Sequence, residues 1–506
     1  MKNIKILIGL IFTVVLFFPS CKGDLLEEQP TNVLVASEFF TSAADAEIAL
    51  NGAYDAMQSD WVFDFVGIPV HWGNKGVDEL NSPNWAAGGR KELQIYQITS
   101  NMIALENLWA GCYQAVNVVN GVIDRVNDMS DDLINAEQRT RIVAEARFIR
   151  GLIYFSMVKI WENIPLITEE TRSLENLNVS QVTPQEVYTQ VIEDVQFAEA
   201  NLEQGQGGGR VTQGAASALL GKVYLQMTGF PLNQTEMFQP AVEQFEKVIN
   251  SGVYSLQPTY SAVFDYLNED NSEVIFAVKF DGPGLNGDGS AVGSYMGPNG
   301  AQNNGGGWGT EYINQELVTS YDANDDRLCH NVAKHNVNNC DSDACIDVSC
   351  EIGACGWRPW KWHKPKPNTF LYDSPMDFIY LRYADVLLSY AEALNRLNGG
   401  PNDVAYDAVE QVTSRSNAPG IEPGLGADEF ADALLRERRR ELCFEGHRKD
   451  DLIRFGKFKE IIMAVNETCW SSAGNPGQEF EDHEIRYPIP QREIDLNPSL
   501  VQNDGY

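Results

Sequence analysis

Apolar residues recur at helical spacing along most of the chain. After Ser42, for example, Ala46, Leu50, Ala53 and Met57 fall on one face of a helix. The same periodicity continues through most of the sequence and predicts helices over 42–57, 102–126, 135–161, 184–202, 212–228, 239–250, 378–397, 403–416 and 428–455. Many of these helices follow one another as pairs joined by short turns. The pattern therefore predicts a mostly α-helical fold.

Small residues stand where paired helices would approach closely, as in 214–225 and 383–394. Pairs that mix Ala and Gly with aromatic residues are typical of a tetratricopeptide-like scaffold, although the period here is not strict. We expect this scaffold to comprise about 38–58, 102–280 and 376–460. A strand is expected at 273–280, and another leads into Phe378.

Two long segments, about 60–97 and 281–366, lack this periodicity. Loops of such length within a helical scaffold are usually functional or disordered. Both segments contain Trp and Tyr, which argues against simple disorder. We therefore expect the function to be located in these two irregular segments.

The N-terminus predicts an exported lipoprotein. Residues 1–20 combine Lys2 and Lys5 with an apolar run over 6–18, as in a secretory signal peptide. The run is too short and too close to the terminus to favour a spanning helix. Cys21 follows at the cleavage boundary and resembles the lipidated cysteine of a bacterial lipobox. We expect residues 21–506 to form a single domain.

The net charge of −34, from 71 acidic and 37 basic residues, argues against nucleic acid as a partner. It suits a solvated surface outside the cytoplasm and uncharged or cationic ligands.

The chain contains nine cysteines, whose spacing helps to indicate whether the protein folds in an oxidising compartment. Their clustering within 329–355 favours disulfides in an exported protein. A zinc site that includes His330 and His335 is the alternative, but its spacing is not of the C-x₂-C type. The disulfide candidates are Cys329, Cys340, Cys345, Cys350, Cys355 and Cys469.

Motifs for catalysis and cofactors are incomplete. Gly282, Gly284 and Gly287 spell GxGxxG, but no helix follows to receive a pyrophosphate. The chain contains no HExxH or GxSxG. Residues 322–326 resemble the start of a calcium loop without its glycine or closing glutamate, which favours a role in turns or caps. We expect no enzyme activity and no cofactor, with a structural Ca²⁺ left open.

Several segments resemble the SusD/RagB family of outer-membrane glycan-binding lipoproteins of Bacteroidetes. They occur in the family's order from one end of the chain to the other: Cys21 with 24–30, then 144–167, 210–225, 381–394, 437–456, 487–498 and 502–506. Two departures are Lys449, where the family often has Trp or Tyr, and 414–417, which lacks the usual Arg-x-Arg-Ala. The stretch 329–355 looks like an insertion.

The resemblance implies a SusD-like fold and a lipid-anchored protein on the outer membrane that faces the exterior. It would bind an oligosaccharide and act as the lid of a SusC-type TonB-dependent transporter during nutrient uptake. Two alternatives are a lid for peptides or another nutrient, and a helical glycoside hydrolase or lyase.

By the same resemblance, loop aromatics form the sugar site, because rings stack on the C–H faces of sugars and polar side chains read their hydroxyls. Trp308 and Trp85 are the preferred candidates, since flanking glycines leave their rings uncovered. The further candidates are Tyr295, Trp72, Trp61, Asn81, Asn84 and Arg90.

The remaining matching blocks predict scaffold. Arg147, Tyr154 and Trp161 recur every seven residues and share a helix face. Asp385 and Glu392 also share a face, and we expect Arg438 or Arg448 to pair with them, since buried charges need partners. Within 437–448, acidic and basic residues at helical spacing predict ion pairs along the helix.

Overall fold

The computed structural model describes residues 39–64, 67–82, 89–175, 177–207, 209–280, 289–298, 307–333, 357–362, 374–466 and 474–506. Long helices dominate these ranges, and their strands are short and form two-stranded sheets. The main helices are α3 (Ala43–Met57), α5 (Ile103–Asp128), α6 (Ala136–Trp161), α7 (Pro184–Asn201), α8 (Gln213–Met227), α9 (Phe238–Asn250), α13 (Tyr383–Leu397), α14 (Asp403–Arg415) and α15 (Ala427–Leu442). The predicted mostly helical fold is confirmed.

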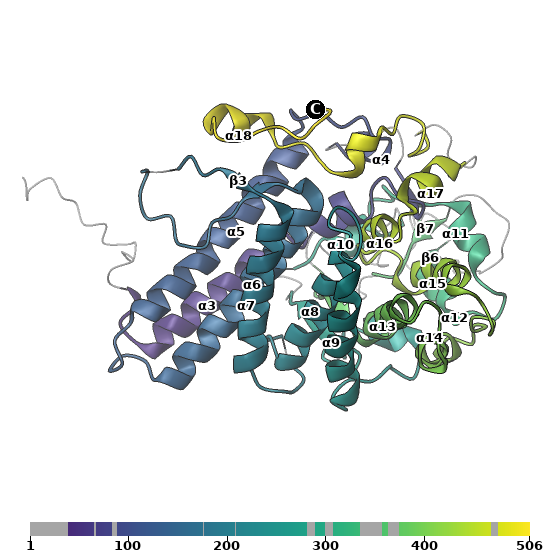
Figure 1. Ribbon diagram of the computed structural model, residues 1–506, viewed down its shortest axis with the longest axis horizontal. Coiled ribbons are helices and arrows are strands. Elements are labelled where there is room, and N and C mark those ends of the chain that lie inside the picture. Colours follow the sequence, from purple (N-terminus) through teal and green to yellow (C-terminus); the bar gives the residue numbers. More distant parts are fainter. Residues whose placement is uncertain are drawn as a thin grey trace, which may run out of the picture.

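The helices form an array in which each packs against the next (Figure 1). The run proceeds from α5 through α6, α7 and α8 to α9, and α3 covers α5 and α6. The chain then leaves the array and returns as α13, which packs against α9, α14 and α15. The excursion between α9 and α13 carries the second irregular segment to the edge of the scaffold.

Helix starts agree with the sequence because polar caps define them. The side chains of Ser42, Asn135 and Thr183 accept hydrogen bonds from backbone N–H groups in the first turns of α3, α6 and α7. Thr183 also forms a capping box with Glu186. Local side-chain chemistry therefore places these boundaries.

Helix α6 lies at the centre of the core, and its second half is buried on nearly all sides. Its predicted packing residues fulfil that role. Arg147 Nε donates to Asp194 Oδ1 at 2.7 Å, and the Tyr154 hydroxyl donates to the Ile167 carbonyl at 2.8 Å. Trp161 is completely buried.

Two predicted helices differ in the structure. Residues 378–382 form strand β8 (Phe378–Arg382), which pairs antiparallel with β4 (Val274–Val278), and only then does α13 begin. Within 428–455, α15 ends at Leu442 and α16 (Arg448–Arg454) follows. The break contains Gly446 at φ +83°, where a Cβ would lie 2.9 Å from Pro69 Cα. Tertiary contact therefore interrupts a helical pattern there.

Short elements fill the irregular regions. The strands are β1 (Leu80–Asn81), β2 (Ile164–Pro165), β3 (Gln181–Val182), β5 (Tyr312–Ile313), β6 (Val332–Ala333) and β7 (Arg358–Pro359). The helical turns are η2 (Pro69–Gly73), α4 (Arg90–Gln94), η3 (Thr235–Met237), η4 (Tyr260–Phe264), α10 (Val292–Tyr295), α11 (Gln315–Ser320), α12 (Asp326–Asn331), α17 (Phe458–Ala464), η7 (Asp482–Ile485) and α18 (Gln491–Leu496).

Buried ion pairs join elements that are distant in sequence. The Glu441 carboxylate accepts hydrogen bonds from three guanidinium groups, those of Arg327 at 2.9 Å, Arg382 at 2.7 Å and Arg415 at 2.5 Å. Burial alone would raise the pKa of Glu441, but the three arginines outweigh it and lower that pKa below its usual range. Glu441 therefore links α12, β8 and α14 to α15.

The prediction that the charged residues within 437–448 pair with one another along the helix is mostly wrong, because most of these residues pair with residues on other elements. Arg438 pairs with Asp385 at 2.9 Å, as expected. Glu392 instead pairs with Arg454 at 2.7 Å, and Arg448 pairs with Asp78 at 2.7 Å. These tertiary partners cannot be read from helical spacing.

The first irregular segment is tied to the C-terminal part of the chain. Trp72 Nε1 donates to Asp450 Oδ1 at 2.7 Å, and the Tyr487 hydroxyl donates to the His71 carbonyl at 2.6 Å. Burial alone would raise the pKa of Asp78, but Arg439 and Arg448 lower it to about 2. Residues 67–82 are therefore held by side chains that occur about 370 or more positions later.

Lys449 lies within an aromatic cage. Its Nζ is 4.2 Å from the ring centroid of Trp72, 4.6 Å from Tyr487, 5.2 Å from Tyr96 and 5.5 Å from Phe458. The side chain is fully buried, and Nζ forms no hydrogen bond with the described residues. Burial lowers the pKa of Lys449 to about 7. The cage attracts the ammonium group but does not hydrogen-bond to it.

Candidate ligand-binding site

Strands β1 and β5 bring the two irregular segments together. They pair antiparallel with Leu80 opposite Ile313 and Asn81 opposite Tyr312. A second link between the two segments is the hydrogen bond that Ser290 Oγ donates to the Asp64 carboxylate, at 2.7 Å. The two regions predicted to contain the function therefore meet at one place beside the helical array.

Trp308 is the outermost member of a stack at this junction. Its ring is partly buried and meets the Tyr295 ring edge to face, with centroids 5.8 Å apart. The Arg90 guanidinium lies 4.5 Å from the Tyr295 ring centroid and also donates to the Tyr295 hydroxyl. Tyr295 is completely buried, and Arg90 is 9% exposed. The predicted residues Arg90, Tyr295 and Trp308 thus form one cluster, in which two members support the third.

The backbone around Trp308 is held against α10. Trp308 N donates to the Ser294 carbonyl at 2.9 Å. A Cβ on Gly307 would lie 2.1 Å from that same oxygen, so a side chain there would push the two segments apart. The sequence interpretation assigned this glycine to ligand access, whereas the structure shows that close packing requires it.

A buried polar group lies behind the junction. Lys75 Nζ donates to Glu311 Oε2 at 2.5 Å and to Ser82 Oγ at 2.6 Å. Burial lowers the pKa of Lys75, Glu311 opposes that shift, and the nearby Arg90 adds to it. This group joins the two irregular segments by charge as well as by strand pairing, which helps to hold the stack in place.

The other predicted aromatic and amide residues are less available. Trp72 is 1% exposed and belongs to the lysine cage. Asn81 is 1% exposed and donates to the Gly474 carbonyl at 3.4 Å. Trp61 is partly buried, with its Cβ in contact with α5 at Gly111. Burial leaves Trp72 and Asn81 no surface for a ligand here, and Trp85 and Asn84 lie outside the described residues.

Two family models match separate parts of the chain. One is described as the SusD family and matches residues 354–506. The other is described as "Starch-binding associating with outer membrane" and matches residues 74–225. The chain belongs to the SusD/RagB family.

Relatives of the SusD/RagB family match over nearly the whole chain. The chain is 25% identical over 554 residues to a SusD-like protein of Formosa agariphila, covering 100% of this chain and 98% of that protein. A crystal structure of a SusD homolog from Bacteroides thetaiotaomicron superposes with a TM-score of 0.81 at 23% identity, covering 94% and 99% of the two chains. A laminarin-binding SusD-like protein reaches 0.73 at 25% identity, covering 92% and 100%.

In this SusD/RagB chain, sequence reasoning missed several residues that shape the junction. Lys75 and Glu311 are charged but completely buried. Arg358 lies 3.5 Å from the ring centroid of Tyr312, on a strand next to β5. Charged residues within segments that also carry many apolar residues were the available signal, but only pairing across segments reveals their partners.

The cysteine and metal predictions are only partly covered by the described residues. Cys329 is disulfide-bonded, and Cys112 and Cys443 are free, buried thiols. The remaining predicted positions, Cys21, Cys340, Cys345, Cys350, Cys355 and Cys469, lie outside the described ranges.

The calcium-like stretch serves local structure. Asp322 Oδ1 accepts a hydrogen bond from Asn324 N at 3.2 Å, and Asp326 Oδ2 accepts one from the Asn417 amide at 2.6 Å. A structural Ca²⁺ stays a prediction.

In the part of the chain that the structure describes, no helix is both long and apolar enough to cross a bilayer.

Proposed function

We propose that this protein captures an oligosaccharide at the junction of its two irregular segments, with Trp308 as the stacking surface. The observation that carries the proposal is the stack of Arg90, Tyr295 and Trp308, which supports a partly exposed indole from behind. The description of a matching family model as starch-binding and the laminarin-binding relative support a glycan as the ligand.

The chemistry of the stack suits a sugar. An indole offers a flat apolar face to the C–H groups of a pyranose ring, while hydroxyl groups at the ring edge remain available for hydrogen bonds. If stacking removes roughly 80 Å² of apolar surface from water, it contributes about 2 kcal/mol at about 25 cal/mol per Å². Millimolar to micromolar affinity corresponds to about 4 to 8 kcal/mol, so one ring supplies a substantial part of it.

The setting of this capture is also a proposal. Cys21 would carry a lipid anchor, and the protein would sit on the outer membrane facing the exterior as the lid of a SusC-type TonB-dependent transporter. The phrase "associating with outer membrane" in the family description supports this location. Release into a transporter requires binding that is not too tight, which agrees with the modest affinity expected from stacking.

The test compares Trp308→Ala with wild type in a panel of glycans and cationic peptides, by calorimetry or affinity electrophoresis. We expect glycan binding in the wild type and at least about a tenfold loss in the variant, from about 2 kcal/mol of lost stacking. Phe230→Ala is the matched control, since Phe230 is a partly exposed aromatic residue after α8.

Three results would contradict the proposal. Unchanged affinity in Trp308→Ala, with melting temperatures equal to wild type, would remove Trp308 from the site. Binding of peptides but not glycans would favour the alternative nutrient. Product formation from a polysaccharide by the purified protein would show a hydrolase or lyase instead.

A further inference from the structure

A cavity of about 230 Å³ lies between α3, the loop before α8 and the end of β4. Three segments that are far apart in sequence contribute polar side chains to its walls. These are Asn51, Tyr54, Asp55, Gln58, Arg210 and Lys279. None of them belongs to the Trp308 stack, so the cavity is a separate feature of the molecule.

Helix α3 presents two different faces. Ala46, Leu50, Ala53 and Met57 form its buried face. Asn51, Asp55 and Gln58 are spaced by four and three residues and therefore share a neighbouring face, which lines the cavity. One face of α3 therefore packs against the core, and the neighbouring face carries amide and carboxylate groups that line the cavity.

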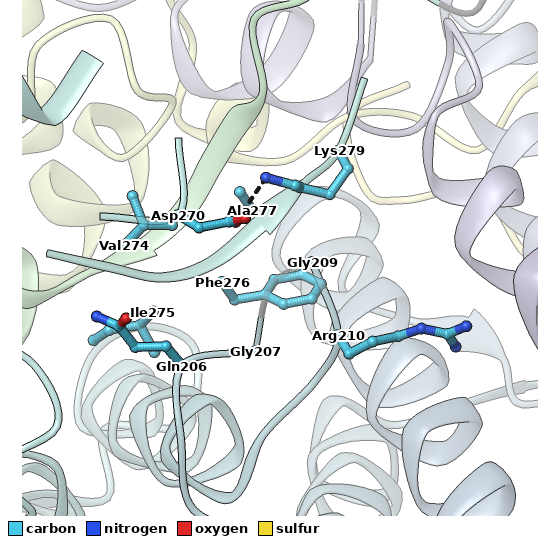
Figure 2. Close-up of a pocket in the computed structure, with 10 residues that line it drawn as sticks. All are labelled: Gln206, Gly207, Gly209, Arg210, Asp270, Val274, Ile275, Phe276, Ala277 and Lys279. Carbon is cyan, nitrogen blue, oxygen red and sulfur yellow. Dashed lines mark hydrogen bonds and ion pairs between the residues drawn. The ribbon is translucent and has the colours of Figure 1, made fainter. Parts of the chain in front are cut away.

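The loop before α8 forms a tight wall. Gly209 has φ +89°, and a Cβ there would lie 2.9 Å from Lys279 Cγ. Arg210 N donates to the Gly207 carbonyl at 2.8 Å. Figure 2 shows this loop beside β4, with the Lys279 side chain turned toward Asp270 and the Arg210 side chain turned the other way. The loop is therefore fixed against the strand.

Arg210 completes the wall on the side of α3. Its guanidinium lies 4.9 Å from the Tyr54 ring centroid and donates to Asn51 Oδ1 at 2.5 Å and to Glu145 Oε2 at 3.3 Å. The Tyr54 hydroxyl donates to the same Glu145 oxygen at 2.6 Å and accepts from Val211 N at 3.0 Å. These contacts hold the polar lining in place before any ligand arrives.

The charges of the cavity are largely neutralised internally. Arg210 pairs with Glu145, and Lys279 pairs with Asp270 and Asp377. An anion would therefore meet at least as many carboxylates as cations. Among the described residues, the Asp55 side chain makes no hydrogen bond or ion pair, but it is exposed, and an exposed ion pair contributes little to binding. Neither an anionic nor a cationic ligand is favoured.

The remaining chemistry suits a neutral polyol. Gln58 Nε2 donates to the Lys279 carbonyl at 2.5 Å and Asn51 Oδ1 accepts from Arg210, which leaves Asn51 Nδ2 as a donor and Gln58 Oε1 and the Asp55 carboxylate as acceptors for a ligand. The partly buried ring of Tyr54 supplies apolar surface, while Met57 and Val278, each 1% exposed, lie beneath the lining. The volume is below the roughly 300–1,000 Å³ of pockets for drug-sized ligands, which limits the occupant to about one ring. We propose that this cavity binds a single neutral sugar unit, as a second saccharide site apart from Trp308; this inference rests on the proposed glycan-binding function.

The test uses saturation-transfer NMR with glucose, galactose, mannose, laminarihexaose and maltohexaose, on wild type and on Trp308→Ala. We expect saturation transfer to persist in Trp308→Ala. Adding Asn51→Ala and Asp55→Ala should weaken the remaining binding about three- to tenfold, as for the loss of one or two hydrogen bonds. Asp407→Ala on α14 is the matched control and should change nothing, and melting temperatures should stay equal because these residues are exposed.

The outcomes separate the two proposals. Binding that disappears in Trp308→Ala and is insensitive to Asn51→Ala and Asp55→Ala would overturn the second site and leave the proposed function standing. Residual binding that these two changes do not weaken would also overturn it. Absence of saturation transfer in the wild type with every sugar would overturn both.

Discussion

Replacing Lys449 by methionine should stabilise the protein at neutral and acidic pH. The substitution keeps an unbranched side chain of similar length within the cage of Trp72, Tyr487, Tyr96 and Phe458 but removes the charge. The charged lysine is costly because it is fully buried and its Nζ lacks a hydrogen bond to the described residues.

The pKa of Lys449 falls from 10.5 to about 7 in the folded chain. At about 1.36 kcal/mol per pH unit, this difference corresponds to about 5 kcal/mol against the charged form. Methionine also loses the attraction between the ammonium group and the rings, roughly 2 kcal/mol. We therefore expect Lys449→Met to raise the free energy of unfolding by about 3 kcal/mol at pH 6.

The sign of the pH dependence follows from proton binding. Between pH 7 and 10.5 the unfolded chain holds the proton on Lys449 more than the folded chain does, so the free energy of unfolding of the wild type rises with pH. Below pH 7 the full cost is present. The advantage of Lys449→Met should therefore shrink as the pH rises from 7 toward 10.

The assay is urea unfolding of the unlipidated protein at pH 6, 7.5, 9 and 10. Lys459→Met is the control, because Lys459 is 57% exposed and pairs with the exposed Asp482. It should change the free energy of unfolding by less than about 0.5 kcal/mol at every pH. A Lys449→Met variant that is less stable than wild type at pH 6, or whose advantage is independent of pH, would show that the buried charge of Lys449 does not destabilise the folded chain.

Three further predictions follow from the buried charges, the Trp308 backbone and the anchor. Glu441→Gln should lower the free energy of unfolding by about 3–5 kcal/mol in chemical denaturation, because three guanidinium groups lose a charged partner. The arginines lower the pKa of Glu441 from its ordinary value of 4.5, so the stabilisation that its carboxylate provides is present above about pH 4.5 and is lost as the pH falls through the lowered pKa. Gly307→Ala should weaken glycan binding several-fold in titrations by moving Trp308 away from Ser294, whereas Gly400→Ala, where a Cβ meets nothing within 4 Å, should not. Cys21→Ala should shift the protein from the membrane to the soluble fraction; membrane retention would mean that a partner, rather than lipid, holds it.

Helical periodicity and caps were sufficient to predict most of the scaffold. Both signals are local, since a helix is defined by residues three and four positions apart and by the residue before its first turn. The predictions were wrong where a distant segment intervenes. Residues 378–382 become a strand because β4 pairs with them, and the helix near Gly446 breaks where η2 packs closely.

The candidate site was harder to predict for a related reason. The sequence identified aromatic residues in the correct segments, but it does not encode which rings remain exposed. Trp72 and Trp308 both occur in irregular stretches, yet Trp72 is enclosed by α16 and the C-terminal segment, while Trp308 stays partly open. The polar lining of the second cavity could not be predicted from the sequence, because its residues come from a helix face, a loop and a strand end that only the folded chain brings together.

The ties between residues 67–82 and the C-terminal part of the chain have a consequence for biogenesis. Trp72, His71 and Asp78 bond to residues that follow 378, 416 and 370 positions later. A chain that is synthesised N-terminus first therefore exposes this segment long before its partners are made. The early helices have neighbours close in sequence and can form as they emerge, but the first irregular segment must wait for the last part of the polypeptide. A prematurely terminated chain would thus keep much of its helical content and lose the contacts that hold residues 67–82.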